Sequence, residues 1–83
     1  MPHSPQDKAR AVARLKRIRG QCEALMRAVE GEAACVDLLQ QIAALRGAVG
    51  GLMAEVLESH LRETFGERDD LDEINRILKT YLK

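Results

Sequence analysis

Residues 33–65 read AACVDLLQQIAALRGAVGGLMAEVLESHLRETF and contain no proline. Apolar residues recur at alternating intervals of four and three, the pattern of a helix that packs along a seam. The seam consists of Leu38, Ile42, Leu45, Val49, Leu52 and Val56, and it is widened by Leu39, Ala43, Met53 and Leu57. The pattern predicts one long helix with two buried faces. Because Gly47, Gly50 and Gly51 each cost about 1 kcal/mol of helix propensity relative to alanine, a break at the glycines is the alternative.

Two reactive residues, Cys35 and His60, lie 25 positions apart on this expected helix. At the rise of an α-helix they are separated by about 38 Å, so they cannot serve one site within one chain. They meet only if two copies of the helix pair antiparallel. The midpoint then falls near Gly47 and Ala48, where small residues (46–51) would let two backbones approach. The spacing predicts a symmetric dimer with a reactive site built across its interface.

Two further helices flank the long one. Ser4 is a suitable N-cap, Pro5 suits the first helical position, and Asp7 lies in the first turn. The helix that follows has an apolar stripe and ends at Gly31; the stripe is Val12, Leu15, Ile18, Cys22, Leu25, Met26 and Val29.

Gly66 marks a turn, after which Asp69 or Asp70 is expected to cap a short third helix. The apolar face of that helix is Leu71, Ile74, Ile77, Leu78, Tyr81 and Leu82. The fold class is therefore all-α, with two long helices and one short one in a single domain, 1–83.

Charge is distributed unevenly along a chain whose formal net charge is zero. Residues 1–20 have a balance of +5, and residues 54–73 have a balance of −6. Such asymmetry favours a basic face for an anionic partner, against a merely solvated helix face. With no stretch of about 20 apolar residues and no export signal, we expect a cytoplasmic protein with reduced cysteines and no membrane partner.

The reactive residues each have an alternative structural interpretation. Cys35 lies near a helix start, where the partial positive charge favours a thiolate, but a small buried residue is equally compatible. Cys22 lies within an apolar stripe and is expected to be a core residue. His60 is structural unless it meets Cys35 across a dimer. Removal of Met1 would leave Pro2 as a terminal secondary amine, although a frayed terminus is the default.

No catalytic motif accompanies these residues. The sequence lacks a CxxC pair, a glycine-rich phosphate loop and a nucleophile with a base at a recognisable spacing, so we do not expect an enzyme.

Several stretches together resemble the CsoR/RcnR family of bacterial transcriptional repressors. They are residues 14–21 (RLKRIRGQ), 39–48 (LQQIAALRGA), 51–60 (GLMAEVLESH) and the termini 1–4 (MPHS) and 81–83 (YLK). The resemblance covers nearly the whole chain. It implies an antiparallel helical-bundle dimer that assembles into a disc-like tetramer, binds double-stranded operator DNA and releases it when an effector binds.

Residues at the family's effector positions distinguish its members. Copper sensors carry a Cys-His-Cys set; Cys35 and His60 match its first two positions, and Thr64 stands at the third. Nickel or cobalt sensors use His3, Cys35, His60 and a further histidine, and Thr64 again stands at the last position. Pro2 with Cys35 is most similar to formaldehyde-responsive members, in which a methylene bridge joins the prolyl amine to the cysteine of a neighbouring subunit. We therefore expect a formaldehyde sensor with Pro2, Cys35 and His60 as its effector site and no required cofactor.

Two alternatives remain open. One is a repressor that responds to a divalent transition metal through His3, Cys35 and His60, and vestigial binding of a metal such as zinc fits that set. The other is a helical interaction module without an effector.

DNA contact is expected from the basic residues Lys8, Arg10, Arg14, Arg17 and Arg46. The sequence shows neither a helix-turn-helix signal nor an aromatic platform for single strands. Phosphate contact with indirect reading of DNA shape is therefore the expected mode.

Overall fold

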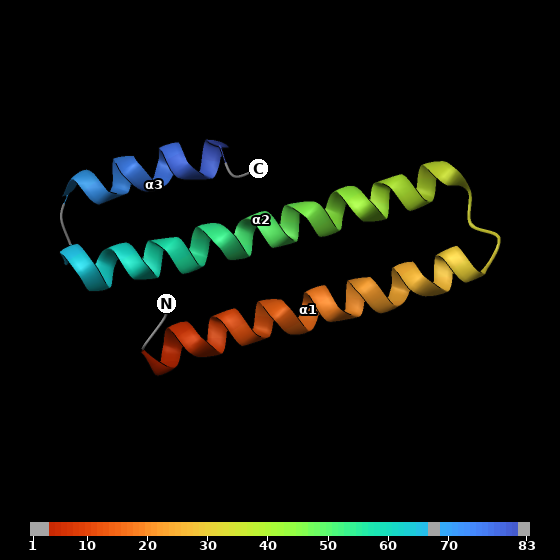
Figure 1. Cartoon of the computed structure of the whole chain (residues 1–83), viewed down its shortest axis with the longest axis horizontal. Helices are drawn as coiled ribbons and strands as arrows, with labels where there is room; N and C mark the ends of the chain where they lie inside the picture. Colours follow the sequence, from red (N-terminus) through yellow and green to blue (C-terminus); the bar gives the residue numbers. More distant parts are fainter. Residues whose placement is uncertain (1–3, 67–68, 82–83) are drawn as a thin grey trace.

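The computed structural model describes residues 4–66 and 69–81 of the chain. These residues form three helices, α1 (Pro5–Glu30), α2 (Cys35–Phe65) and α3 (Asp69–Tyr81) (Figure 1). The predicted fold class, all-α with two long helices and one short one, is confirmed.

The ends of the helices follow the local chemistry of the sequence. At the start of α1 the Ser4 hydroxyl accepts a hydrogen bond from the Asp7 backbone N–H at 3.0 Å, with Pro5 at the first helical position. The Gly31 N–H donates to the Arg27 carbonyl at 3.0 Å and ends the helix. Gly66 ends α2 with φ +75°, a conformation that favours glycine.

The glycines of α2 do not interrupt it. The helix is continuous for 31 residues, so the alternative of a break at Gly47, Gly50 and Gly51 is wrong. The expected cap of α3 is wrong as well, because Asp69 is already the first helical residue. The capping position, residue 68, lies outside the described residues.

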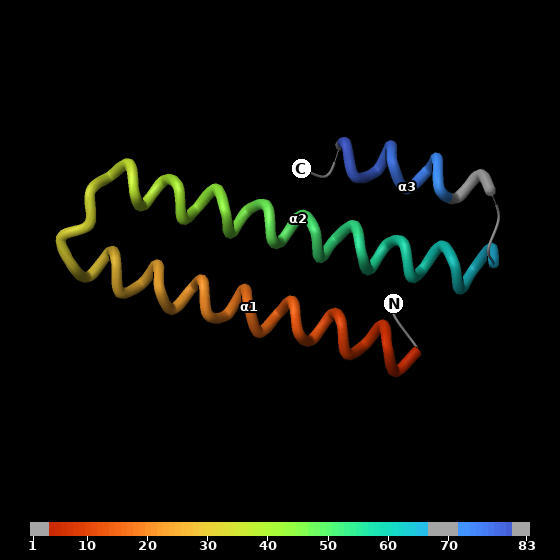
Figure 2. The backbone as a smooth tube through the Cα atoms, turned by 180° about the vertical axis from the view of Figure 1, so that it is seen from behind, coloured from red at the N-terminus to blue at the C-terminus, as the bar shows by residue number. Residues whose placement is uncertain are grey.

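The helices lie side by side in a flat layer. α1 and α2 form an antiparallel hairpin, and α3 runs back along the other edge of α2, in both views (Figures 1 and 2). The layer measures 50 × 26 × 11 Å. Since 11 Å is about the diameter of one helix, no second layer covers either face of α2.

A single layer leaves most apolar side chains exposed. Among the side chains that the structure describes, Ser59 is the one that is buried, with 2% of its surface exposed. The larger apolar residues that remain exposed are Val12, Leu15, Met26, Val29, Val36, Leu39, Ile42, Val49, Met53, Phe65, Ile74 and Ile77. The sequence predicted two buried faces for α2, and a single chain buries only part of them.

Cys22 departs from its prediction as a core residue. It is half-buried and lies on a shallow apolar surface with Leu25, Met26 and Val29. The physical reason is the thickness of the layer, because no helix of the same chain lies over this part of α1.

Candidate functional site

Cys35 is the first residue of α2, and its side chain is exposed. Ala34 precedes it at the N-cap position and provides no side-chain hydrogen bond to the free backbone N–H groups of the first turn. The thiol therefore lies at an open helix terminus, accessible to an incoming electrophile or metal ion.

His60 is also exposed, near the opposite end of the same unbroken helix. The 25 residues between it and Cys35 correspond to a rise of about 38 Å and a net rotation of only about 20°. The two side chains thus project from the same face of α2 at opposite ends. One chain cannot bring them together, as the sequence predicted.

An exposed apolar stripe joins these two residues along α2. It consists of Leu39, Ile42, Val49 and Met53. An antiparallel pair of α2 helices that matched Cys35 of one chain with His60 of the other would also oppose Ile42 to Met53. Both of these side chains are about half exposed in the single chain, at 47% and 53%.

Gly47, where the sequence predicts the close approach of two chains, lies off the face of α2 that carries Cys35 and His60. This residue lies about 120° around α2 from Cys35, off the apolar stripe. It lines a groove beside Lys79 of α3 instead. A Cβ atom added to Gly47 would meet nothing within 4 Å, whereas one added to Gly51 would meet the Arg14 side chain of the same chain. The face that carries Cys35 and His60 presents larger apolar residues.

The start of α1 lies at the His60 end of α2. Arg62, one helical position beyond Leu61 and two beyond His60, has its Nη2 atom 3.6 Å from Asp7 Oδ1. Pro2 and His3 lie outside the described residues.

The proposed metal set is not assembled within one chain. Among the described residues no group of three His, Cys, Asp or Glu side chains is placed to hold a metal ion. Cys35 and His60 offer one ligand at each end of α2. Two ligands per site therefore become available only across a pair of chains, and His3 would have to supply a third.

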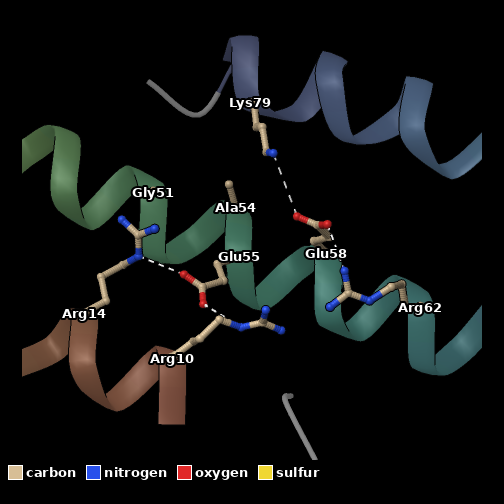
Figure 3. A pocket seen from close by; sticks show the side chains of 8 residues that line it. All are labelled: Arg10, Arg14, Gly51, Ala54, Glu55, Glu58, Arg62 and Lys79. Atoms are coloured by element: carbon tan, nitrogen blue, oxygen red, sulfur yellow. Dashed lines mark hydrogen bonds and ion pairs between the residues drawn. The ribbon is translucent and has the colours of Figure 1, made fainter. Parts of the chain in front are cut away.

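A charged groove of about 380 Å³ lies on the face of the layer opposite to the apolar stripe (Figure 3). We call it the basic groove; its lining residues are Arg10, Arg14, Gly51, Ala54, Glu55, Glu58, Arg62 and Lys79. α1, α2 and α3 all contribute to it. Glu55 lies about 160° around α2 from Cys35, so the two faces of the layer carry different chemistry.

Ion pairs cross the basic groove. Arg14 Nε donates to Glu55 Oε2 at 2.8 Å, and Arg10 Nε lies 3.9 Å from Glu55 Oε1. Arg62 Nη1 donates to Glu58 Oε1 at 2.9 Å, and Lys79 Nζ lies 3.9 Å from Glu58 Oε2. Two residues predicted to contact DNA, Arg10 and Arg14, are therefore paired with a carboxylate of their own chain.

The other predicted DNA contacts are distributed unequally. Arg17 is exposed and shares the face of α1 that carries Arg10. Arg46 is exposed and lines the neighbouring groove with Lys79. Lys8 lies about 160° around α1 from Arg10, so it does not share a surface with the other basic residues of this helix.

Asp7 connects the start of α1 to the far end of α2. Its carboxylate pairs with Arg10 and with Arg62. The hydrogen bond from Arg10 lowers the pKa of Asp7 below its ordinary value of 3.8, and hydrogen bonds from Ser4 and Ser59 act in the same direction while desolvation opposes them. The buried Ser59 thus belongs to the contact that holds α1 beside His60.

Asp7→Asn is expected to destabilise the folded chain at neutral pH. Asparagine keeps the size of the side chain and the backbone N–H that Ser4 accepts, so only the charge is removed. Because the pKa of Asp7 is lowered on folding, this stabilisation is present above the ordinary carboxyl pKa and is lost as the pH falls through the lowered value. Urea unfolding followed by circular dichroism should show the difference from the parent shrinking towards acid pH.

Asp37→Asn provides the matched control, because Asp37 occupies the first turn of α2 as Asp7 occupies that of α1. Both substitutions remove a favourable charge from a helix N-terminus. Equal losses of stability in the two variants would show that the ion pairs of Asp7 contribute nothing.

Sequence reasoning missed the two acidic residues of the groove, Glu55 and Glu58, and two of its four basic residues, Arg62 and Lys79. Arg62 with Glu58 and Arg10 with Asp7 have helical spacings of four and three that are readable from the sequence. Arg14 and Glu55 are 41 residues apart, and Lys79 reaches the groove from α3. These contacts follow only from the way the three helices pack.

A sequence profile of the metal-sensitive transcriptional repressors matches residues 7–80. The chain belongs to this family. The repressor is therefore a member of the CsoR/RcnR group, as the sequence resemblance implied, and it is a regulator and not an enzyme. Membership also implies binding to operator DNA, which sets aside a plain helical interaction module.

Relatives of the repressor cover its whole length. It is 45% identical over 91 aligned residues to an uncharacterized protein from the bioA 5′ region of Serratia marcescens, with 100% of each chain covered. It is 40% identical over 90 residues to the transcriptional repressor RcnR homolog of Escherichia coli O139:H28 (strain E24377A / ETEC), again with 100% of each covered.

A solved structure of similar fold is a variant of the formaldehyde-responsive regulator FrmR from Salmonella enterica serovar Typhimurium. The TM-score is 0.75 and the sequence identity is 45%, with 98% of the repressor and 94% of that chain covered. None of the helices described for the repressor combines the length and apolarity needed to cross a membrane.

Proposed function

We propose that this repressor is a cytoplasmic formaldehyde sensor that releases operator DNA when formaldehyde joins Pro2 of one subunit to Cys35 of a neighbour. The observation that carries the proposal is the placement of an exposed Cys35 and the start of α1 at opposite ends of the layer, with an apolar face between them. The likeness to FrmR, a formaldehyde-responsive regulator, supports the choice of effector.

The bridge must form between chains. α1 is about 39 Å long, so the start of that helix is far from Cys35 of its own chain. An antiparallel partner, packed through the exposed apolar stripe, brings its Cys35 to His60 and so to the start of α1. Pairing of dimers into a disc-like tetramer would cover further apolar residues of α1, such as Met26 and Val29.

The chemistry suits a terminal proline. A secondary amine condenses with formaldehyde to an iminium ion and releases water; this iminium has no N–H proton to lose and stays electrophilic. The Cys35 thiolate then attacks the methylene carbon and forms N–CH2–S, after His60 has accepted the thiol proton. Because one carbon must span nitrogen and sulfur, the reaction requires the two groups to be held a few ångströms apart.

Operator binding is assigned to the basic face. Arg17 is exposed on the face of α1 that carries Arg10, and Arg10 and Arg14 line the basic groove. Arg46 is exposed too, but it lies about 20° around α2 from Cys35, beside the apolar stripe, and lines the neighbouring groove with Lys79. Oligomerisation repeats this surface in every subunit, so a net charge of zero is no obstacle to phosphate binding. A bridge that fixes the start of α1 against a neighbouring α2 would change the position of these side chains relative to the phosphates.

The second candidate is a response to a divalent transition metal through His3, Cys35 and His60. The family is described as metal-sensitive, and the RcnR homolog is 40% identical, which keeps this alternative in place. Titration with zinc or nickel, followed by operator release, tests it directly. Under this alternative, metal releases DNA and formaldehyde does not.

Intact-protein mass spectrometry tests the primary proposal. Stoichiometric formaldehyde should add about 12 Da per site, the mass of one carbon, because one water leaves as the bridge forms. Denaturing electrophoresis should show a covalent dimer. The Pro2→Ser variant should form less of the bridge, since the iminium of a primary amine can lose its N–H proton and become a neutral imine. A parent protein that gains no mass at stoichiometric formaldehyde would refute the assignment.

A further inference from the structure

Glu55 occupies the centre of the basic groove between two guanidinium groups. Its Oε2 atom accepts from Arg14 Nε at 2.8 Å, and its Oε1 atom lies 3.9 Å from Arg10 Nε (Figure 3). Both arginines come from α1 and both reach across to α2. An acidic oxygen pair held between two arginines has the same chemistry as a DNA phosphate held between them.

The backbone of α2 is shaped to receive the Arg14 side chain. The guanidinium group of Arg14 lies over Gly51, one turn before Glu55 on α2. A Cβ atom added to Gly51 would lie 2.7 Å from Arg14 Nη1, closer than side-chain atoms approach. A glycine at this position therefore permits the arrangement in which Arg14 lies flat on α2 and contacts Glu55.

The contact is nevertheless incomplete. Glu55 Oε1 is shielded from solvent but accepts no hydrogen bond. The side chains of Arg14 and Glu55 are 33% and 24% exposed, so the pair is partly open to solvent and within reach of an external ligand. Ion pairs in such partly exposed positions contribute about 1 kcal/mol or less, which a phosphate that makes fuller contacts can replace.

We propose that Glu55 is an internal competitor for DNA phosphate, holding Arg14 and Arg10 when DNA is absent and yielding them to the phosphate backbone when DNA binds. The proposal rests on the operator binding of the proposed function, but not on formaldehyde as the effector. Glu55 sets the strength of DNA binding without touching DNA bases. Its neighbour Glu58 is occupied by Arg62 and Lys79 and has no part in this exchange.

Two variants release Arg14 by different means. Glu55→Gln keeps the shape of the side chain and removes its charge, and Gly51→Ala keeps every charge and displaces the Arg14 guanidinium. Glu23→Gln is the matched control, because it removes one carboxylate from an exposed position of α1 outside the groove. Affinity for a short mixed-sequence DNA duplex is measured by fluorescence anisotropy at one fixed salt concentration, with circular dichroism to verify helix content.

We expect Glu55→Gln to bind the duplex about fivefold more tightly than the parent and Gly51→Ala about threefold, with Glu23→Gln unchanged. The Arg14 Nε–H resonance of the parent should shift on addition of DNA, and in Glu55→Gln it should already be shifted without DNA. Equal tightening in Glu55→Gln and Glu23→Gln would reduce the effect to net charge and overturn the proposal. Unchanged or weaker binding by a helical Glu55→Gln protein would overturn it too. Failure of the parent to gain mass with formaldehyde would refute the effector assignment alone.

Discussion

Cys35→Ala is expected to bind operator DNA as the parent does and to lose release by formaldehyde completely. The thiol lies at the start of α2, on the face opposite to the basic groove, so its removal leaves the phosphate-binding residues in place. Without the thiolate the prolyl iminium has no partner at this position and is hydrolysed back to the amine. The measurement is anisotropy of an operator duplex selected from random-sequence DNA by the parent, with and without stoichiometric formaldehyde.

Cys22→Ala is the control for this experiment. Cys22 is half-buried on α1, about 26 Å along the helix from Pro5 and about 12 Å from Glu30, so the variant should release DNA as the parent does. If Cys35→Ala still releases DNA with formaldehyde, or if Cys22→Ala fails to release it, the bridge does not involve Cys35.

The two ends of α1, the end of α2 and the continuity of α2 were predictable because they depend on local chemistry, whereas the start of α3 was not. Ser4 and Pro5 start α1, and Gly31 and Gly66 end two helices, through contacts within one or two turns. In α2 the regular spacing of the apolar seam outweighs the cost in helix propensity of its three glycines. These effects act between near neighbours in the sequence, so a helix end can be predicted from one or two residues at that position.

The contacts that each face of α2 makes were less predictable, because they depend on which helices lie beside it. The small residues of α2 suggested a crossing of two chains at Gly47, whereas Gly47 lines a groove beside α3 and Gly51 accommodates Arg14. Likewise the sequence does not distinguish Arg14 from Lys8, since both are basic residues of α1. In the folded chain, however, the packing of α1 against α2 pairs Arg14 with Glu55. The distance between Cys35 and His60 was readable, since it follows from helix length alone.

Ile42→Glu is expected to dissociate the dimer, the largest effect that we predict for assembly. Ile42 lies on the exposed apolar stripe, on the face of α2 that carries Cys35 and His60. In a symmetric pair the substitution occurs twice, and an unpaired carboxylate buried in an apolar interface costs on the order of several kcal/mol. Sedimentation velocity at micromolar concentration measures the change, and loss of the formaldehyde bridge should accompany it.

A second substitution tests the register of the pair. The antiparallel alignment that joins Cys35 to His60 opposes position 42 of one chain to position 53 of the other, so Met53→Lys added to Ile42→Glu should restore much of the dimer through two cross-chain ion pairs. Within one chain these positions are three turns apart and cannot pair. Val36→Lys added to Ile42→Glu is the control, because Val36 is exposed but lies off the stripe, about 100° around α2 from Cys35. A double variant with Met53→Lys that stays as dissociated as this control would exclude the register, and with it the meeting of Cys35 and His60 across the interface.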